Sequence, residues 1–436
     1  SKMYVYITVN QSVTLENATI YPLLEEGDTA TNLKSVTKFT ITTTGEDAIE
    51  VLYRNYYSSH EVEGDSTTPV ADTSWYEMYP DATEYTIASS ADLYGLAKLV
   101  NDGTDTFAGK TVSVVKNITV NKGIVKRYRE TGNAPAWVAD SAEKTYPWTP
   151  IGTAWGTWFN GTFDGHGHEI SGIYLNATAG KNGFFGYTGN ASVLKNFKFV
   201  NSYIKATVAN VGLIGASYTL QYENIYNDAS IHYTAGYVGG FVGYLGAVSG
   251  KQQVFNNCWF DGELYHGGNV YTSAFVGMIG EVSNIKMTNC LMTGDVVGVT
   301  GGVHTGNHYG TLLGFANKAG TKVEIANCMV AGYVNLSGTV GKGALVGNQN
   351  NSTGSMTNVY LISEPTTITT LQGSTNAGIT TNNVGRVESS SMSSLSQEKL
   401  LEKFPTSDGE EQAWVCAEGE TPILKTFASW YKGREK

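Results

Sequence analysis

Histidines beside a carboxylate are the residues of this chain with the most obvious potential for chemistry. His166 and His168 form a His-x-His pair close to Asp164, and His304 and His308 occupy a second glycine-rich segment. Imidazole and carboxylate groups are common metal ligands, but a stable site needs a third or fourth ligand, and the sequence identifies none for either pair. We therefore expect both segments to be exposed polar turns, and we predict no metal and no cofactor.

Carboxylates are a second source of chemistry. Enzymes that cleave polysaccharides need two carboxylates at a fixed separation, or a carboxylate beside Arg or Lys. The candidates are scattered singly, without a close partner in register: Asp164, Asp228, Asp261, Glu263, Glu281, Asp295 and Glu324. No nucleophile or phosphate-loop motif is present. We predict that no residue is catalytic; a polysaccharide lyase or glycosidase is the alternative, because folding can still bring two carboxylates together.

Aromatic residues are numerous, with 27 Tyr, 15 Phe and 8 Trp. Exposed rings can stack on the faces of sugars, whereas buried rings only fill a core. The candidate binding residues are Trp137, Trp155, Trp158, Tyr265, His304, His308 and Tyr309. We expect the contact regions to be the loops 121–158 and 296–310, and the alternative is that these rings pack against the body of the protein.

A short glycine-bounded pattern shows which elements would position these residues. Two apolar residues closed by a glycine recur six times, at intervals of 28 to 37 residues. The closing glycines are Gly186, Gly215, Gly243, Gly277, Gly314 and Gly347. We expect each glycine to occupy a turn that requires a positive φ or a close approach of two backbone segments.

A second pattern follows each glycine, an Asn that precedes an apolar residue or Cys. Its members are Asn196, Asn224, Asn257, Asn289, Asn327 and Asn358, three of them followed by Cys258, Cys290 and Cys328. Coils that stack in parallel place equivalent residues one above another, about 4.8 Å apart. We expect a ladder of buried Asn side chains bonded to backbone and to each other, and a column of Cys side chains in the core. A disulfide or metal role for the thiols is the alternative.

Repeats of about 30 residues with short strands cannot bury an apolar face alone, so the copies must stack. The sequence therefore predicts an all-β chain, a right-handed parallel β-helix over 77–430. Helical caps are expected near 89–102 and 394–404, a strand pair over 414–427, and a surface loop over 121–147. Residues 1–76 alternate in hydrophobicity and predict a small antiparallel β-sandwich-like module, and 431–436 form a polar tail.

The formal net charge of −11 argues against a nucleic-acid partner, which would require a basic surface. The longest basic stretch, Lys126-Arg127-Tyr128-Arg129, precedes Glu130 and is expected to be a solvated loop. No apolar run approaches the length of a membrane span, about 18 residues, and no signal peptide is visible. The start at Ser1 is typical of a mature or truncated chain, and we expect no membrane insertion.

The repeated Gly-[Leu/Phe]-[Val/Ile]-Gly unit resembles the GLUG-motif repeats of bacterial surface proteins. The segments Phe159 to His168 and Pro422-Ile423-Leu424 resemble the flanks of such repeats, and the likeness covers roughly 84–427. The resemblance implies a parallel β-helix displayed outside the cell, without catalytic activity of its own. We therefore expect an extracellular or cell-surface binding or adhesion protein of a bacterium, with a glycan or a host surface protein as partner. A structural spacer for another domain is a further alternative.

Overall fold

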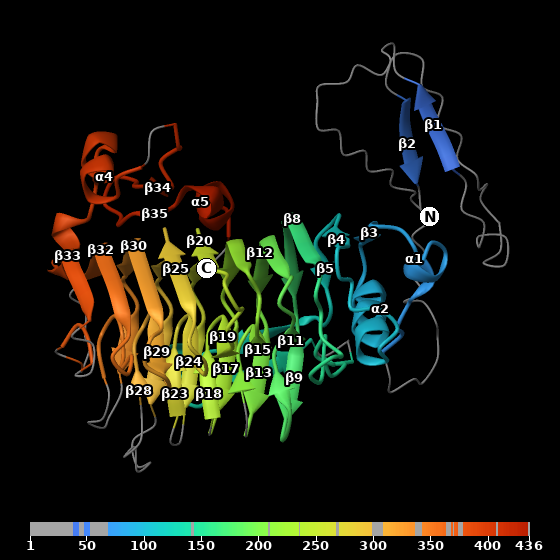
Figure 1. Ribbon diagram of the computed structural model, residues 1–436, viewed down its shortest axis with the longest axis horizontal. Helices are drawn as coiled ribbons and strands as arrows, with labels where there is room; N and C mark the ends of the chain where they lie inside the picture. Colours follow the sequence, from blue (N-terminus) through green and yellow to red (C-terminus); the bar gives the residue numbers. More distant parts are fainter. Residues whose placement is uncertain are drawn as a thin grey trace.

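The chain forms a parallel β-solenoid of about 8 turns, with 46% strand and 12% helix (Figure 1). The predicted all-β solenoid class is therefore confirmed. The computed structural model describes residues 38–42, 48–52, 69–140, 144–207, 210–234, 236–266, 270–298, 308–335, 342–362, 368, 370–373, 378–406 and 409–434.

The first two sheets of the solenoid are built from parallel strands of successive coils. The long sheet contains β3 (Glu84–Ile87), β4 (Thr111–Val114), β5 (Ile118–Thr119), β8 (Thr162–Ser171), β12 (Val193–Val200), β16 (Gln221–Asn227), β20 (Gln253–Asn256), β21 (Trp259–Phe260), β25 (Asn284–Thr288), β26 (Leu291–Met292), β30 (Lys322–Val330), β32 (Thr353–Ile362) and β33 (Ile379–Val387). The second sheet contains β9 (Tyr174–Ala177), β13 (Tyr203–Ala206), β17 (Ser230–Tyr233), β22 (Glu263–His266), β27 (Asp295–Gly298) and β31 (Tyr333–Asn335).

Two shorter sheets complete each coil. The third sheet contains β10 (Lys181–Asn182), β14 (Asn210–Val211), β18 (Gly236–Gly239), β23 (Val270–Ser273) and β28 (His308–Tyr309). The fourth contains β11 (Phe185–Thr188), β15 (Ile214–Ser217), β19 (Val242–Leu245), β24 (Val276–Ile279) and β29 (Leu313–Ala316). We number the coils by their strand in the fourth sheet, so that β11 belongs to coil 1 and β29 to coil 5. Residues 148–161 form an entry turn before coil 1, with bridges from Ile151 to Phe185 and from Phe159 to Thr188.

Five of the six closing glycines are the second residue of a strand of the fourth sheet, so the expectation that they occupy a turn was wrong. A Cβ built on Gly215 would lie 2.6 Å from the Asn182 nitrogen, and one on Gly277 would lie 2.3 Å from the Val238 oxygen. Neither glycine has a positive φ. Of the two expected reasons for glycine, the close approach of backbone from the preceding coil is therefore the one that applies.

The positive φ belongs to the Asn ladder instead. All six predicted Asn residues have φ between 52° and 58°, and Asn383 adds a seventh member with φ 55°. Asn tolerates this left-handed conformation better than most residues, so it bends each strand of the long sheet at the same level. Of the six predicted positions only Asn257 is buried and the others are half-buried, so the expectation of buried Asn side chains was wrong for most of the ladder.

Side-chain hydrogen bonds join the ladder over part of its length. Asn224 Nδ2 donates to Asn196 Oδ1 at 2.9 Å, and Asn257 Nδ2 donates to Asn224 Oδ1 at 2.6 Å. Further along, Asn358 donates to Asn327 at 3.2 Å and Asn383 donates to Asn358 at 2.8 Å. These bonds satisfy amide groups that the bend withdraws from water.

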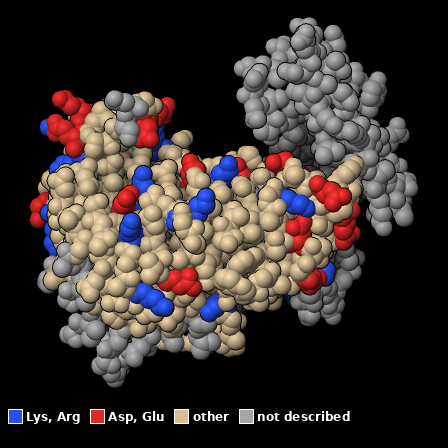
Figure 2. All heavy atoms as spheres, viewed as in Figure 1, with Lys and Arg blue, Asp and Glu red and all other residues tan. Residues whose placement is uncertain are grey.

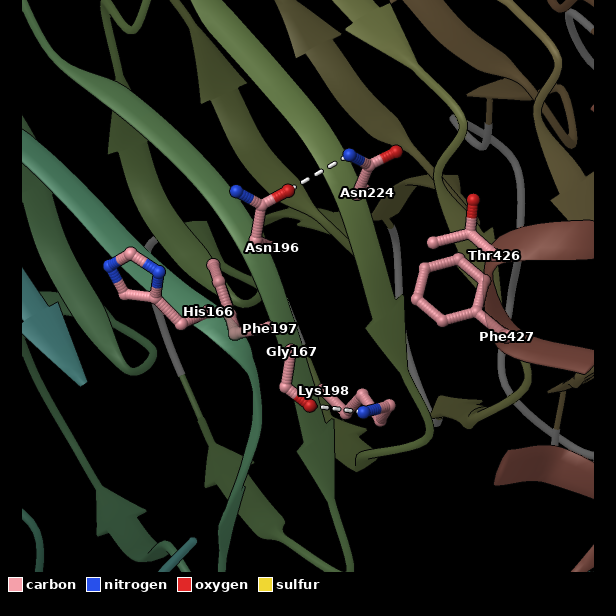
Figure 3. Close-up of a pocket in the computed structure, with 8 residues that line it drawn as sticks. All are labelled: His166, Gly167, Asn196, Phe197, Lys198, Asn224, Thr426 and Phe427. Atoms are coloured by element: carbon pink, nitrogen blue, oxygen red, sulfur yellow. Dashed lines mark hydrogen bonds between the residues drawn. The ribbon is translucent and has the colours of Figure 1, made fainter. Parts of the chain in front are cut away.

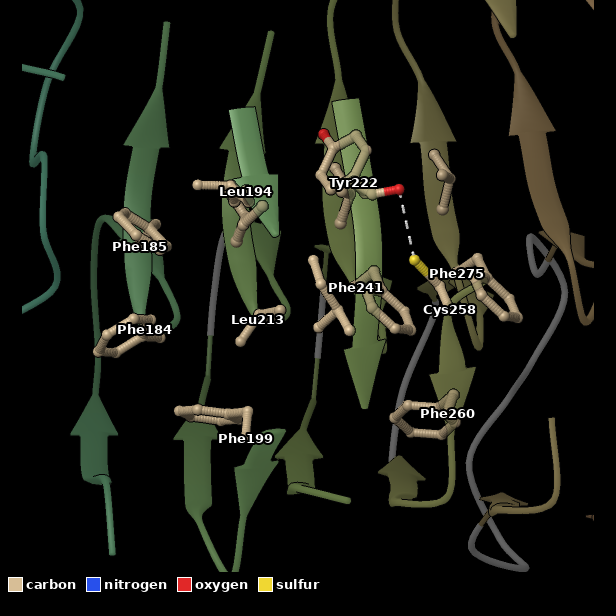
Figure 4. Packing of buried hydrophobic residues seen from close by; sticks show 14 of the residues in the cluster. Phe184, Phe185, Leu194, Phe199, Leu213, Tyr222, Phe241, Cys258, Phe260 and Phe275 are labelled. Atoms are coloured by element: carbon tan, nitrogen blue, oxygen red, sulfur yellow. Dashed lines mark hydrogen bonds between the residues drawn. The ribbon is translucent and has the colours of Figure 1, made fainter. Parts of the chain in front are cut away.

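The core runs through the solenoid as columns of similar side chains (Figure 4). Phe241 and Phe275 stack at 5.0 Å with ring planes 4° apart. Cys258, Cys290 and Cys328 are free and buried, and the Cys290 nitrogen donates to Cys328 Sγ at 3.4 Å. Each of these cysteines directly follows a ladder Asn, a position that an apolar residue occupies in the other coils. They therefore fill the interior as small hydrophobic groups.

The N-terminal end is closed by α2 (Ser90–Asn101), which agrees with the predicted cap over 89–102. The Ser89 side chain accepts a hydrogen bond from the Asp92 nitrogen, and Asp92 bonds in return to the Ser89 nitrogen. This capping box satisfies donors that a helix leaves open at its start. The short helix α1 (Ser74–Glu77) packs Trp75 and Tyr76 against Phe107 beside it.

The C-terminal segment does not cover the far end of the solenoid. It contains η3 (Ser389–Ser391), α4 (Gln397–Lys403), β34 (Trp414–Val415), β35 (Ile423–Leu424) and α5 (Lys425–Lys432). In Figure 1 it lies above β20, β25, β30 and β32. Its Leu400, Phe404, Trp414, Leu424 and Phe427 pack with Tyr226, Trp259, Leu291, Met329 and Tyr360 of the long sheet. It therefore shields the side of the long sheet rather than its last edge.

Two predicted boundaries in this segment change, and one predicted strand pair is present. The helix expected over 394–404 begins later, because Ser396 rather than Ser394 accepts the capping bond, from the Lys399 nitrogen. The strand pair is present, as β34 and β35 pair antiparallel. The expected tail 431–436 overlaps the end of α5, and Arg434 bonds to Asp228 at 2.5 Å.

At the N-terminus, β1 (Lys38–Thr42) and β2 (Ala48–Leu52) form an antiparallel pair, as expected for a small β module there. Most of the remaining predicted module, up to residue 68, lies outside the described residues. Among the described helices, none is long and apolar enough to cross a membrane.

Candidate functional site

A band of aromatic rings runs along the third and fourth sheets on the outside of the solenoid. The residue after the closing glycine is half-buried in coils 1, 3 and 5 while its neighbours are buried, which places its side chain on the outer face. We call this surface the aromatic strip, and its members are Trp155, Trp158, Tyr187, Tyr218, Tyr237, Tyr244, Tyr271, His308 and Phe315. The entry turn and each of coils 1 to 5 contribute at least one ring.

The entry end of the strip is an exposed tryptophan with two supporting rings. Trp155 is 64% exposed. Its ring lies 4.4 Å from Trp158 and 5.0 Å from Tyr218, which it meets edge to face at 83°. Tyr218 in turn lies over Gly246 of the next coil, since a Cβ there would be 2.1 Å from its ring. The entry end therefore presents a firmly supported flat apolar surface to solvent.

The far end of the strip consists of rings stacked on one another. Tyr271 of coil 4 lies 5.2 Å from Tyr237 of coil 3 and 5.0 Å from His308 of coil 5. The Tyr271 and His308 planes are 4° apart, and Phe315 stacks on both at 5.1 and 4.2 Å. Burial lowers the pKa of His308, which favours the neutral imidazole, and its Nδ1 has no hydrogen-bond partner in the described part of the chain.

The hydroxyl groups of the strip are unpaired. Within the described residues, no hydrogen bond joins the hydroxyls of its five tyrosines, Tyr187, Tyr218, Tyr237, Tyr244 and Tyr271, to another residue. The buried tyrosines differ: Tyr222 bonds to Ser217 at 2.5 Å, Tyr233 to Thr272 at 2.9 Å and Tyr309 to Thr311 at 2.7 Å. The strip therefore holds a row of donors and acceptors that only solvent or a ligand can satisfy.

Burial favours the protonated form of four of these phenols, Tyr187, Tyr218, Tyr244 and Tyr271. Burial, the nearby Tyr244 hydroxyl and the Glu281 carboxylate raise the pKa of Tyr218 to about 12. Burial likewise raises the pKa of Tyr187, Tyr244 and Tyr271. Each hydroxyl is consequently a donor as well as an acceptor at neutral pH.

Four of the seven predicted binding residues lie elsewhere or outside the described residues. Trp137 is half-buried, bonds to Thr145 and packs against Tyr174 of the second sheet. Tyr265 is 7% exposed beneath Tyr128, and Tyr309 is in the core. His304 lies outside the described residues, as does most of the loop 296–310. Trp155, Trp158 and His308 belong to the aromatic strip.

The predicted loop 121–147 carries a segment that is bound to the solenoid. We call residues 123–139 the strap; it contains β6 (Gly123–Lys126), α3 (Tyr128–Thr131) and β7 (Ala136–Ala139). Arg127 donates to the backbone oxygens of Asp228 at 2.7 Å and Asp261 at 3.0 Å. Arg129 donates to Asp295 at 3.0 Å and lies over the Tyr333 ring. The expectation that the basic stretch is a solvated loop was wrong, because acidic residues from successive coils hold it.

Glu263 and Asp295 are direct neighbours in β22 and β27, which corrects the expectation that no carboxylate has a partner in register. Burial raises the pKa of both. The pair is covered, since Glu263 accepts from the Tyr128 nitrogen at 2.8 Å and from Ser230 at 3.0 Å, and Asp295 accepts from Arg129. Both carboxylates are thus used in fastening the strap to the solenoid.

The His-x-His pair does not form a shared site. His166 bonds to Ser113 at 3.1 Å and His168 to Asn117 at 3.3 Å, so the two imidazoles have separate partners. His166 also borders a cavity of about 280 Å³ between the long sheet and α5, which Lys198 and Phe427 help to line (Figure 3). The polar groups drawn there are bonded within the chain, as when Lys198 Nζ donates to the Gly167 oxygen.

No group of three or more potential metal ligands occurs among the described residues. Burial raises the pKa of the Cys290 and Cys328 thiols well above the usual range, so these sulfurs remain protonated rather than becoming thiolate ligands. Cys416 is half-buried in the C-terminal segment, where the Leu395 nitrogen donates to its sulfur at 3.2 Å.

Six members of the strip were not among the predicted binding residues: Tyr187, Tyr218, Tyr237, Tyr244, Tyr271 and Phe315. Three of these residues carry a simple signal, because Tyr187, Tyr244 and Phe315 each come directly after a closing glycine. The glycine is the second residue of its strand, and the next residue then faces outward. A list of the residues that follow the six closing glycines would have identified three of the nine members of the strip.

No family model, no curated protein and no solved structure matches this chain.

Proposed function

We propose that this chain is a noncatalytic, extracellular or cell-surface binding protein of a bacterium, related to GLUG-repeat proteins, and that its aromatic strip binds carbohydrate. The observation that carries the proposal is the combination of an exposed Trp155 ring with a row of phenol hydroxyls that have no hydrogen-bond partner among the described residues. Sugars present apolar C–H faces and many hydroxyls, so they match a surface that offers both.

The alternative of a polysaccharide-cleaving enzyme has one observation in its favour, the adjacent carboxylates Glu263 and Asp295. A glycosidase needs its two carboxylates on either side of a bound sugar and open to it. Here the strap lies over the pair, and Glu263 is 0% exposed. The position of the two carboxylates therefore favours a structural role. Binding is proposed instead on the aromatic strip, which the strap does not cover.

The proposal is tested by measuring the binding of the protein to arrays of microbial, plant and host glycans and of host matrix proteins. We expect binding to carbohydrate, and we expect Trp155→Ala to weaken it roughly tenfold, because loss of a tryptophan that carries a contact commonly costs more than about 1 kcal/mol. Trp137→Ala is the matched control, since this ring lies away from the strip, and it should retain full affinity. Binding to matrix proteins alone, or a Trp155→Ala variant with unchanged affinity, would contradict the proposal.

A further inference from the structure

We infer that the aromatic strip binds a linear, uncharged polysaccharide that lies parallel to the solenoid axis and spans the entry turn and coils 1 to 5. The inference rests on the proposed function and adds the orientation, length and charge of the ligand.

The shape of the strip gives the direction. Its rings come from six successive levels of the solenoid, and equivalent strands lie about 4.8 Å apart, so the strip is about 24 Å long. Across the axis the Tyr237 and Tyr244 ring centroids of coil 3 are 6.1 Å apart, so the strip is narrow at this coil compared with its length. A long, narrow surface of this kind suits one extended chain along its length better than a compact or branched ligand.

The two ends of the strip offer different contacts. At the entry end Trp155 presents an exposed ring, on which a sugar can stack. At the far end the stacked Tyr271 and His308 are separated by 5.0 Å, close to the spacing of coils, so their faces lie against each other along the axis and their edges face outward. The far end therefore offers the Tyr271 hydroxyl for hydrogen bonding rather than an open ring face for stacking.

The charges beside the strip favour a neutral chain. The acidic side chain nearest its tyrosines is Glu281, which contributes to the raised pKa of both Tyr218 and Tyr244. Lys181 aligns with Tyr237 through Asn210, so it is a single cation in this column, where the aligned residues of the next coils are Asn210 and Tyr237. On the face drawn in Figure 2, charged side chains are scattered over the coils with broad uncharged areas between them. A uronate polymer would meet Glu281 without a row of cations to offset it.

The experiment measures affinity for gluco-, xylo- and manno-oligosaccharides of increasing length, and for polygalacturonate and alginate as charged probes. It uses calorimetry with wild type, Trp155→Ala and Tyr271→Phe. For the neutral series that binds, we expect affinity to rise with each added sugar until the chain covers the strip. Trp155→Ala should weaken every length, whereas Tyr271→Phe, which removes one far-end hydroxyl, should weaken only the longer chains, by several-fold. Circular dichroism should show the same fold for all three proteins.

Two results would overturn the inference and leave the proposed function intact. The first is affinity that stops rising at a di- or trisaccharide, with Tyr271→Phe equal to wild type at every length. The second is tighter binding to polygalacturonate or alginate than to any neutral chain. Failure of every carbohydrate to bind wild type is a different outcome, since it removes the proposed function itself.

Discussion

Two surfaces of this solenoid are built from the same coils and differ in what covers them. Beside the second sheet, acidic residues of successive coils meet the strap, and their carboxylates or backbone oxygens accept hydrogen bonds from it. Along the third and fourth sheets, the aromatic residues of the same coils contact mainly one another, and within the described residues the hydroxyls of the five tyrosines have no hydrogen-bond partner. Repetition produces a row of like groups in both places, and only the second row is open to a partner.

In a repeat protein, a row of equivalent side chains that supports the fold can be distinguished from a row that is available to a ligand by whether its polar groups are paired. A buried polar group without a partner costs about 1 to 3 kcal/mol, so rows in the interior are paired. The tyrosines of the core follow this rule. A row that is half-exposed and unpaired is under no such constraint, and binding activity is best sought there.

Among the substitutions that test the contrast between the two surfaces, Arg127→Met is expected to have the largest effect on stability. Arg127→Met removes the cation that bridges Asp228 and Asp261, and leaves the nearly buried Asp228 carboxylate with Arg434 as its cation and the Asn201 nitrogen as a further donor. We expect a loss of about 2 to 3 kcal/mol in the free energy of unfolding, below the full cost of a fully buried pair because Arg127 is partly exposed. Denaturant unfolding and hydrogen exchange over 123–139 measure it.

Arg129→Met is the matched control, because the side chain of Arg129 is 57% exposed and its ion pair with Asp295 lies nearer solvent. This variant should lose less than about 1 kcal/mol. Equal destabilisation by the two substitutions would mean that the strap is not held mainly at Arg127.

A smaller effect sharpens the contrast between paired and unpaired tyrosines. Tyr233→Phe leaves the buried Thr272 hydroxyl without its partner and should cost about 1 kcal/mol of stability. Tyr244→Phe removes a hydroxyl that has no partner and should change stability by less than about 0.5 kcal/mol. Thermal unfolding of the two variants decides the matter, and a Tyr244→Phe variant as unstable as Tyr233→Phe would show that the strip is a structural row.

The smallest expected effect is pH-dependent. Burial raises the pKa of Glu263, so its charged form disfavours the folded state at neutral pH, and protonation relieves this cost as the pH falls through the raised pKa. Glu263→Gln keeps an acceptor for the Tyr128 nitrogen without the charge. We expect the variant to be more stable than wild type by less than about 1 kcal/mol at pH 7, with the difference disappearing near pH 4. If the stability difference between Glu263→Gln and wild type instead grew as the pH fell, the charged Glu263 carboxylate would not be the source of the cost.

Much of the fold could be predicted because it depends on local rules that recur. In every coil a closing glycine marks a close approach of backbone and a ladder Asn marks a bend, and the Ser89 cap depends on residues three positions apart. The strap could not be predicted, because Arg127 and Asp261 are joined only after the coils have stacked. The pairing of Glu263 with Asp295 was missed for a similar reason, since the unequal lengths of coils hide which residues align.

For the candidate site, the sequence indicated Trp155, Trp158 and His308 but also Tyr265 and Tyr309, which are buried. An aromatic residue in a strand faces either the core or the outside, and a shift of one position reverses the direction. His308 and Tyr309 are adjacent and illustrate this, as the first belongs to the strip and the second to the core. Composition alone does not distinguish them.

The Asn ladder has a consequence for how such a protein can change over generations. Because every coil carries its own Asn bend and its own closing glycine, a whole coil is a self-contained unit that pairs with whatever copy lies above or below it. Duplication or loss of one coil by recombination would preserve the fold of the rest. It would also lengthen or shorten the aromatic strip by one coil. The length of the strip and the length of the solenoid would therefore change together, one coil at a time.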